Sequence, residues 1–173
     1  MFATLFLPNF YLQAALRHQS ELLVRPVALI DDQEAKPIVI QLNAAAEAVG
    51  VTVGMTPSQG LARYLQLIVK TRLRGQERLL DDLLLQFAFS LAPYVEATAP
   101  GVCTIQFTET KNIRRNLERI IEQFAVSDLT AKAGIAPTPD ASLLAAHTAN
   151  PVLQVNDARD FLAPLPIETL LVA

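Results

Sequence analysis

The sequence predicts an α+β domain in which helices stack on one face of a mixed β-sheet. Short apolar runs such as Ala3–Leu7 have the length of buried strands, while Gln76–Leu91 and Asn112–Ala125 repeat apolar residues at helical spacing. The expected order is strand–helix at the start and then helix, two strands, helix and strand further along the chain. That order is typical of helices packed on a mixed sheet.

A β-hairpin is expected around position 100. Tyr94–Thr98 and Val102–Phe107 alternate in the manner of strands, and Ala99–Gly101 lies between them. Its proline presets φ for a turn, and its glycine supplies the positive φ that closes one. Because both strands are mostly apolar, we expect the hairpin in the middle of the sheet, with both faces partly covered. The stretch Ala97–Thr108 contains no Asp, Glu or His.

Capping rules place the helix starts in the first half of the chain. Asn9 and Asn43 are expected N-caps, and Thr56 is expected to cap a helix with Pro57 at its first position. The expected strands are Ala3–Leu7, Val27–Ile30 and Ile38–Leu42, the expected helices are Phe10–His18, Ala44–Val49 and Pro57–Tyr64, and an extended segment follows at Leu67–Val69.

In the second half, Thr138 and Pro139 repeat the cap-plus-proline start. The expected elements after the hairpin are the helix Asn112–Ala125, the strand Leu129–Ala136, the helix Ala141–Ala149, the short strand Val152–Val155 and a helical turn at Asp157–Leu162. Pro164 and Pro166 are expected to loosen the chain before Ile167–Leu171.

Composition favours one compact domain, or one with a small lobe attached. Of 173 residues, 51% are hydrophobic and 18% are charged, and the formal net charge is −3. The single cysteine, Cys103, lies in an apolar strand, so we expect a core residue in a reducing compartment. The apolar runs are too short for a bilayer, and Met1–Leu7 lacks the basic region of a signal peptide. We therefore expect a cytoplasmic protein without membrane contact.

The main basic cluster is Lys70–Arg78, with a smaller one at Lys111–Arg115. A domain that grips DNA on its own usually carries a basic face, whereas this chain is acidic overall. We favour solvated surface charge for both clusters. The alternative is contact with template phosphates by the four cations Lys70, Arg72, Arg74 and Arg78.

Asn43–Pro57, NAAAEAVGVTVGMTP, resembles the N-Y-E-A-R-x-x-G-V-x-x-G-M-P segment of the Y-family translesion DNA polymerases. Further likenesses follow in the family's order over nearly the whole chain. They are Leu5–Arg17 with the first palm strand and helix, Arg25–Ala28 with K-P-V-A-V, Val95–Phe107 with the V-E-x-x-S-I-D-E-A-Y-L-D-V hairpin, and Gly134–Pro151 with G-I-S-x-N-K-x-x-A-K-x-A-S-x-x-x-K-P.

The resemblance implies a polymerase-palm mixed sheet and a small helical fingers lobe. Residues 1–10 and 74–163 would form the palm-like α+β domain, and 11–73 a fingers-like segment with its adjoining strands. Residues 164–173 would begin a linker toward a missing thumb.

The same resemblance locates the positions of metal-assisted nucleotidyl transfer. The family takes one Asp from the end of the first strand and an Asp-Glu pair from the hairpin. The first falls on Leu7, and the pair on Gly101 and Val102, or on Pro100 and Gly101 if the register slips by one. None has a side-chain oxygen, and the neutral amide of nearby Asn9 cannot hold two divalent ions. We therefore expect no bound metal, no cofactor and no catalysis.

The family's grip on the triphosphate is missing as well. Its Tyr and Arg fall on Ala44 and Glu47, which replace a hydroxyl and a cation by a methyl group and an anion. Arg pairs with phosphate as a bidentate fork, whereas Glu repels it. The family's Lys falls on Pro139, and its bulky aromatic falls on Leu12, next to Tyr11.

This pattern resembles the ImuB type of Y-family relative, which keeps the fold without the active site. The resemblance implies a non-catalytic scaffold in damage-induced mutagenesis and translesion synthesis. Its implied partners are an ImuA-type protein, an error-prone replicative-class DNA polymerase and the sliding clamp, with the clamp contact outside this chain and DNA binding weak or indirect. Two alternatives stay open: an active polymerase with displaced acids such as Glu96, Asp31 or Glu47, and an unrelated α+β protein-interaction domain.

Overall fold

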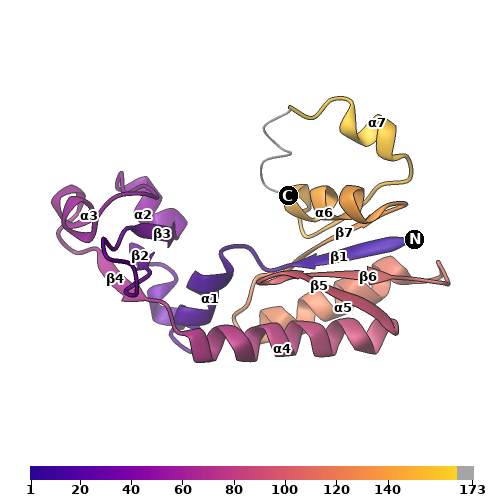
Figure 1. Cartoon of the computed structure of the whole chain (residues 1–173), viewed down its shortest axis with the longest axis horizontal. Helices are drawn as coiled ribbons and strands as arrows, with labels where there is room; N and C mark the ends of the chain where they lie inside the picture. The colour runs from indigo at the N-terminus through magenta and orange to yellow at the C-terminus, as the bar shows by residue number, and fades with distance from the viewer. Residues whose placement is uncertain (167–173) are drawn as a thin grey trace. The chain divides into compact units, whose positions relative to one another are not determined.

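A computed structural model describes residues 1–166 of the chain (Figure 1). Its contacts divide the chain into two compact units. The large unit consists of Met1–Pro8 and Leu80–Ala173, and the small unit of Asn9–Leu79. The predicted linker at 164–173 falls mostly on residues 167–173, which lie outside the described residues, as does the segment Ile167–Leu171.

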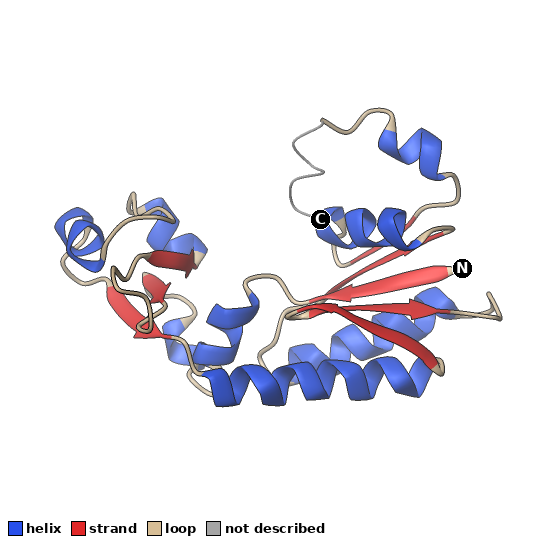
Figure 2. Cartoon of the chain, in the orientation of Figure 1, coloured by secondary structure: helices blue, strands red, loops and turns tan. Residues whose placement is uncertain are grey.

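The large unit is built on a five-stranded mixed sheet (Figure 2). Its strands lie in the order β5-β6-β1-β7-β8, where β1 is Phe2–Phe6, β5 is Tyr94–Ala99, β6 is Val102–Gln106, β7 is Lys132–Ala136 and β8 is Val152–Gln154. β1 pairs antiparallel with β6 and with β7, whereas β7 and β8 are parallel. The predicted α+β class with a mixed sheet is confirmed.

Two helices, α4 (Arg74–Leu91) and α5 (Ile113–Val126), lie on one face of this sheet (Figure 1). Their apolar stripes carry buried side chains such as Leu84 and Leu117, and the rings of Phe87 and Phe124 meet edge to face with 5.0 Å between centroids. The predicted helical periodicities therefore mark the sides of α4 and α5 that form the core.

The opposite face is covered by α6 (Pro139–Thr148), and the short helix α7 (Ala158–Leu162) follows β8. Gly134 of β7 lets α6 come close, since a Cβ there would lie 2.1 Å from the Ser142 carbonyl oxygen and 2.3 Å from the Ala146 nitrogen. The prediction named helices on one face, and α6 adds cover on the second.

The small unit contains a three-stranded sheet in the order β3-β2-β4. β2 pairs antiparallel with β3 and parallel with β4, and apolar clusters lie around Leu29 and around Ala28, whose side chains alternate along β2. The elements are β2 (Val27–Ile30), β3 (Val39–Leu42) and β4 (Ile68–Thr71), the helices α1 (Phe10–Leu16), α2 (Ala44–Ala48) and α3 (Pro57–Arg63), and a 3-10 turn at Ser20–Leu22.

Three of the four predicted helix caps are confirmed. The Asn43 side chain accepts the Ala46 N–H at 3.0 Å, Thr56 forms a capping box with Gln59, and Thr138 accepts the Ala141 N–H at 3.3 Å. Asn9 occupies the N-cap position of α1, as predicted, but it has a left-handed backbone with φ 48° and its side chain makes no capping hydrogen bond.

The predicted place of the hairpin in the sheet is also wrong. The hairpin forms as expected, with Gly101 at φ 72°, but β5 is an edge strand whose residues are mostly exposed. Only β6 is interior, between β5 and β1. The apolar residues of β5 favoured a central strand, but the order of strands in a sheet is decided by their pairing partners and not by their composition. The strand predicted at Leu129–Ala136 begins only at Lys132, although Leu129 is buried.

Candidate functional site

The candidate site is the end of β1 together with the turn of the hairpin, both in the large unit. Leu7 follows β1, and its N–H donates to the Gly101 carbonyl oxygen at 2.9 Å. The Gly101 N–H in turn donates to Oδ1 of Asp81 on α4 at 2.8 Å. The backbone of the turn is therefore held from two sides, by β1 and by a carboxylate of α4.

The side chains at this place are apolar. Leu7 is fully buried, Gly101 and Val102 are buried, and Pro100 is exposed on the turn. Within residues 1–166, no group of three or more His, Cys, Asp or Glu side chains could hold a metal ion. Two divalent ions need several oxygen ligands with negative charge, and this donor set does not fit them.

Asp81 was not among the sequence-predicted site residues, although it is a carboxylate bonded to the turn. It lies 20 residues from Gly101 in sequence, and α4 carries a second acid, Asp82, beside it. The helical pattern alone does not tell which of the two reaches the hairpin. Asp81 accepts a backbone N–H there, which is a structural role for a carboxylate.

Cys103 of β6 is a buried core residue, as expected. Burial, and to a smaller degree the charge of Asp81, raises the pKa of its thiol to about 12. The thiol therefore stays protonated at neutral pH, which excludes it as a nucleophile in the folded chain.

The sequence-predicted nucleotide positions lie on three helices. In the small unit, Leu12 on α1 is buried and its N–H donates to Oε1 of Gln41 at 2.9 Å, while Ala44 and Glu47 on α2 are exposed. In the large unit, Pro139 is the first residue of α6 and is exposed. None of these positions carries a cation that could bind a phosphate.

Pro139 also lines a hollow of about 290 Å³ beside the hairpin. The hollow lies on the α6 face of the sheet, because Glu96 and Thr104 are cross-strand partners and Thr4, the partner of Thr104, contacts α6. Its lining consists of Phe2, Pro93, Tyr94, Val95, Glu96, Thr104, Gln106 and Pro139. Its only charged group is one carboxylate, so it attracts neither phosphate nor a pair of metal ions.

Four hydroxyl groups form a chain of hydrogen bonds from this hollow to α6. Ser142 donates to the Pro139 carbonyl oxygen at 2.7 Å, so Thr4, at 2.8 Å, donates to Ser142. The Thr104 hydroxyl lies 3.4 Å from that of Thr4 and 2.9 Å from that of Thr98, and Thr98 can also donate to the Glu96 carbonyl oxygen at 3.5 Å. The chain joins β5, β6 and β1 to α6 across the face.

Among the sequence-predicted phosphate contacts, Arg72 has the most internal partners. Its Nε donates to Glu77 at 2.9 Å, its Nη1 donates to Asp31 at 3.1 Å, and its guanidinium carbon lies 3.9 Å from the centroid of the Tyr11 ring. The hydrogen bond with Glu77 raises the pKa of Arg72 above its ordinary value. The Arg72 side chain is thus bonded to two carboxylates and stacked on one aromatic ring, all within the small unit.

The other three cations differ in what they contact. Lys70 Nζ donates to Oε1 of Gln19 at 2.9 Å, Arg74 Nη2 donates to Asp31 at 3.1 Å with its side chain 46% exposed, and Arg78 is exposed on α4. The pKa of Asp31 is lowered, first by the Gln33 N–H and then by the two arginines. Phosphate contact by Lys70, Arg72, Arg74 and Arg78 stays the untested alternative to the favoured interpretation as surface charge.

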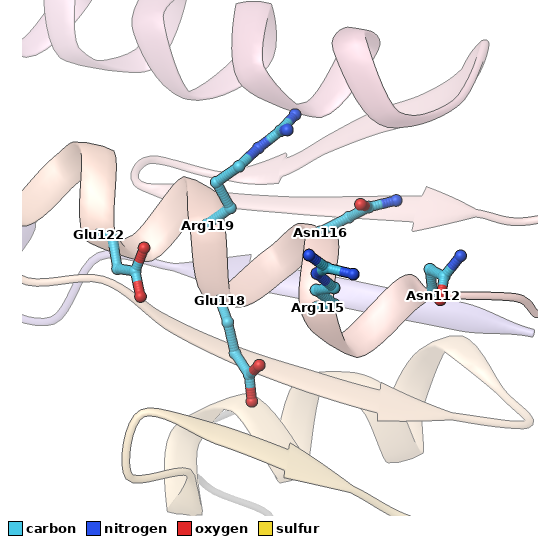
Figure 3. A pocket seen from close by; sticks show the side chains of 6 residues that line it. All are labelled: Asn112, Arg115, Asn116, Glu118, Arg119 and Glu122. Atoms are coloured by element: carbon cyan, nitrogen blue, oxygen red, sulfur yellow. The ribbon is translucent and has the colours of Figure 1, made fainter.

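A second hollow, of about 400 Å³, runs along α5 and is lined by residues of that helix and by Asn112, which precedes it. Figure 3 shows its side chains, with Arg119 extending toward α4 and Glu118 pointing the other way. The lining residues are Asn112, Arg115, Asn116, Glu118, Arg119 and Glu122. Mixed charges at helical spacing are typical of a solvated helix face.

Comparison with known proteins identifies the fold. The model of the impB/mucB/samB family matches residues 5–147. No curated protein matches in sequence. Among solved structures, an insertion ternary complex of Dbh DNA polymerase has a TM-score of 0.84 at 15% identity, covering 97% of this chain and 53% of that one. DinB from Sulfolobus solfataricus has a TM-score of 0.81 at 16% identity, with 97% and 52% covered.

The chain thus spans about half the length of these polymerases. No helix within residues 1–166 is long and apolar enough to cross a membrane. The matched family covers most of the sequence, and the structural likeness includes both units. The chain belongs to the impB/mucB/samB family and has the palm-and-fingers fold of the Y-family DNA polymerases.

Proposed function

We propose that this chain is a non-catalytic palm-and-fingers module that serves as a scaffold in translesion DNA synthesis and damage-induced mutagenesis. The observation that carries the proposal is the absence of side-chain oxygens at Leu7, Gly101 and Val102, where the family resemblance assigns the metal-binding acids. Leu7 is fully buried, and the Gly101 N–H of the turn donates to Asp81.

The nucleotide positions support the same reading. A polymerase must hold a triphosphate with cations and hydroxyl groups, and Ala44, Glu47 and Pro139 offer neither. By contrast, the packing positions of the fold are intact, as the buried apolar cores of both units indicate. A chain that keeps the packing of the fold and lacks the groups that bind metal and nucleotide is what we expect of a non-catalytic scaffold.

A primer-extension assay tests the proposal directly. The purified chain is incubated with primed template, nucleotides and Mg²⁺ or Mn²⁺, with an active Y-family polymerase as positive control. We expect no template-dependent extension. Extension that is lost in an Asp81→Asn variant would overturn the proposal, because it would assign the chemistry to a displaced carboxylate.

The proposed partners are an ImuA-type protein and an error-prone replicative-class DNA polymerase, with the sliding clamp bound outside this chain, in the cytoplasm. Size-exclusion chromatography of the purified chain with each of the first two tests this part separately. Co-elution with at least one is expected. The chain's net charge of −3 agrees with weak or indirect DNA binding, which we expect to disappear as salt is raised.

A further inference from the structure

β5 has an open edge. It is the terminal strand in the order β5-β6-β1-β7-β8, and no strand within residues 1–166 pairs with its outer side. Unpaired edges attract extended peptides, and proteins usually guard them with lysine or proline. β5, with the sequence YVEATA, contains neither; its one charge is Glu96, and its pairing with β6 is regular from Tyr94 to Ala97, with a register shift only between Ala97 and Ala99.

The register shows which backbone groups lie on that edge. The bonds from the Phe107 N–H to Met1 and from the Leu7 N–H to Gly101 mean that the odd-numbered residues of β6 bond to β1. Thr104 and Gln106 therefore bond to β5, and their partners Glu96 and Tyr94 point their backbone groups inward. The N–H and C=O groups of Val95 and Ala97 are left on the open side.

The sequence segment that contains this edge is acidic and partly aromatic. From Leu79 to Thr110 the sequence has no Lys, Arg or His and four carboxylates, Asp81, Asp82, Glu96 and Glu109. Two aromatic side chains, Phe89 in the last turn of α4 and Tyr94 at the start of β5, are 55% and 60% exposed.

The lysine and arginine side chains of the large unit belong to segments other than β5 and β6. Lys132 is in β7, and the basic side chains of α5 belong to a helix that packs against β7 and β8, at the far end of the strand order. Of these, Arg119 extends toward α4 (Figure 3). The charge along β5 itself is therefore the negative charge of Glu96.

We propose that the outer edge of β5 binds an extended, lysine- or arginine-bearing segment of another protein by strand addition. Backbone bonds to Val95 and Ala97 supply affinity, and Glu96 selects for a cation on the α6 face. A second copy of the chain is disfavoured, since pairing β5 with β5 brings two acidic surfaces together. The proposal goes beyond the scaffold function and does not depend on it, because the edge is open whether or not the chain is catalytic.

A labelled eight-residue peptide of alternating lysine and valine is a suitable probe, because its cations face Glu96 while its apolar side chains face α4. Binding to the full chain is followed by fluorescence anisotropy. The control peptide has the same sequence and charge with N-methyl groups on every backbone amide, so it keeps the electrostatics and can form no ladder with either edge. We expect the control to bind at least about tenfold more weakly.

On the protein, Ala97→Pro removes one outward N–H and leaves the inner ladder intact, while Ala97→Val keeps that N–H. We expect the proline variant to lose about tenfold or more in affinity and the valine variant to stay within about twofold. The Glu96→Lys variant is expected to bind the lysine-bearing peptide more weakly than the unmodified chain does. Circular dichroism and thermal unfolding verify that each variant is folded.

Equal binding of both peptides, or equal affinity of the Ala97→Pro and Ala97→Val variants, would overturn strand addition. Stronger binding of a peptide with glutamate in place of lysine would overturn the basic partner. Sedimentation of the chain alone as a dimer that Ala97→Pro dissociates would assign the edge to a second copy and overturn the proposal as well. None of these results bears on primer extension, so the two proposals fail separately.

Discussion

The hydroxyl chain between the sheet and α6 makes a quantitative prediction about Ser142 and Thr4. Thr4 and Ser142 are fully buried, and Thr4 donates to Ser142 across 2.8 Å. Ser142→Ala leaves the Thr4 hydroxyl without its acceptor, and an unsatisfied buried donor costs about 1–3 kcal/mol. We expect this variant to lower the free energy of unfolding by an amount in that range.

The double variant separates this bond from other effects. Thr4→Val keeps the shape of the side chain and removes one partner, at an expected cost of about 1 kcal/mol. With both partners apolar no hydroxyl of the pair is left unsatisfied, and Thr104 keeps Thr98 as a partner at 2.9 Å, so the double variant should cost less than the sum of the single costs by at least about 0.5 kcal/mol. Thr98→Val is the matched control, because Thr98 is exposed at the outer end of the row of hydroxyl groups and makes no contact with Thr4 or Ser142.

Urea unfolding, together with hydrogen exchange of the amides of β1 and β7, measures these free energies in the large unit specifically. The reasoning would be refuted if Ser142→Ala cost no more than Thr98→Val. It would also be refuted if the Thr4 and Ser142 costs were additive within about 0.3 kcal/mol, the behaviour of independent sites.

Three further predictions concern the same unit. Gly134→Ala should abolish cooperative unfolding or lower the melting temperature sharply in a thermal scan, because its Cβ would meet backbone atoms of α6 at 2.1 and 2.3 Å, whereas Gly75→Ala, with nothing within 4 Å, should not. Asp81→Ala should cost about 1.5–3 kcal/mol in urea unfolding by leaving the Gly101 N–H unbonded, while Asp81→Asn keeps an acceptor and should cost less than half of that. The pKa of Cys103 is raised from 9.0 to about 12, so the folded state holds its proton more tightly and the thiol's contribution to stability should fall as pH rises from 9 to 12. Alkylation of the thiol by iodoacetamide at pH 8 should accordingly require unfolding, and rapid labelling of the native chain would contradict this.

Local rules predicted most of the secondary structure. The caps at Asn43, Thr56 and Thr138 depend on residues within a few positions, and the structure confirms them. Asn9 is the N-cap residue of α1 as well, but its backbone lies in the left-handed region, which asparagine tolerates, and its side chain makes no capping bond.

Long-range pairing was harder to foresee. The Arg72–Asp31 contact spans 41 residues and the Gly101–Asp81 contact spans 20, so neither follows from periodicity or capping. The sequence therefore predicts surface charge for the basic cluster Lys70–Arg78. In the structure, one member of the cluster, Arg72, forms ion pairs with Asp31 and Glu77. The sequence did not predict that β5 lies at the edge of the sheet, for the same reason: the register and the neighbours of a strand depend on tertiary contacts.

The sequence predicted which positions form the candidate site but not the contacts between them. The family resemblance located Leu7, Gly101 and Val102 as positions without oxygens, and the structure brings Leu7 and Gly101 together through a backbone bond of 2.9 Å. The role of Asp81 in holding the turn could be recognised only from its hydrogen bond with the Gly101 N–H in the structure.

The central claim is that this polymerase-like core has no place for a divalent ion at the end of β1. Paramagnetic broadening by Mn²⁺ of the backbone amide signals of Leu7, Gly101 and Val102 measures that directly. We predict that these three signals broaden no more than other buried amides as Mn²⁺ is raised. Saturable broadening confined to them, removed by excess Mg²⁺, would place an ion at the turn and contradict the account.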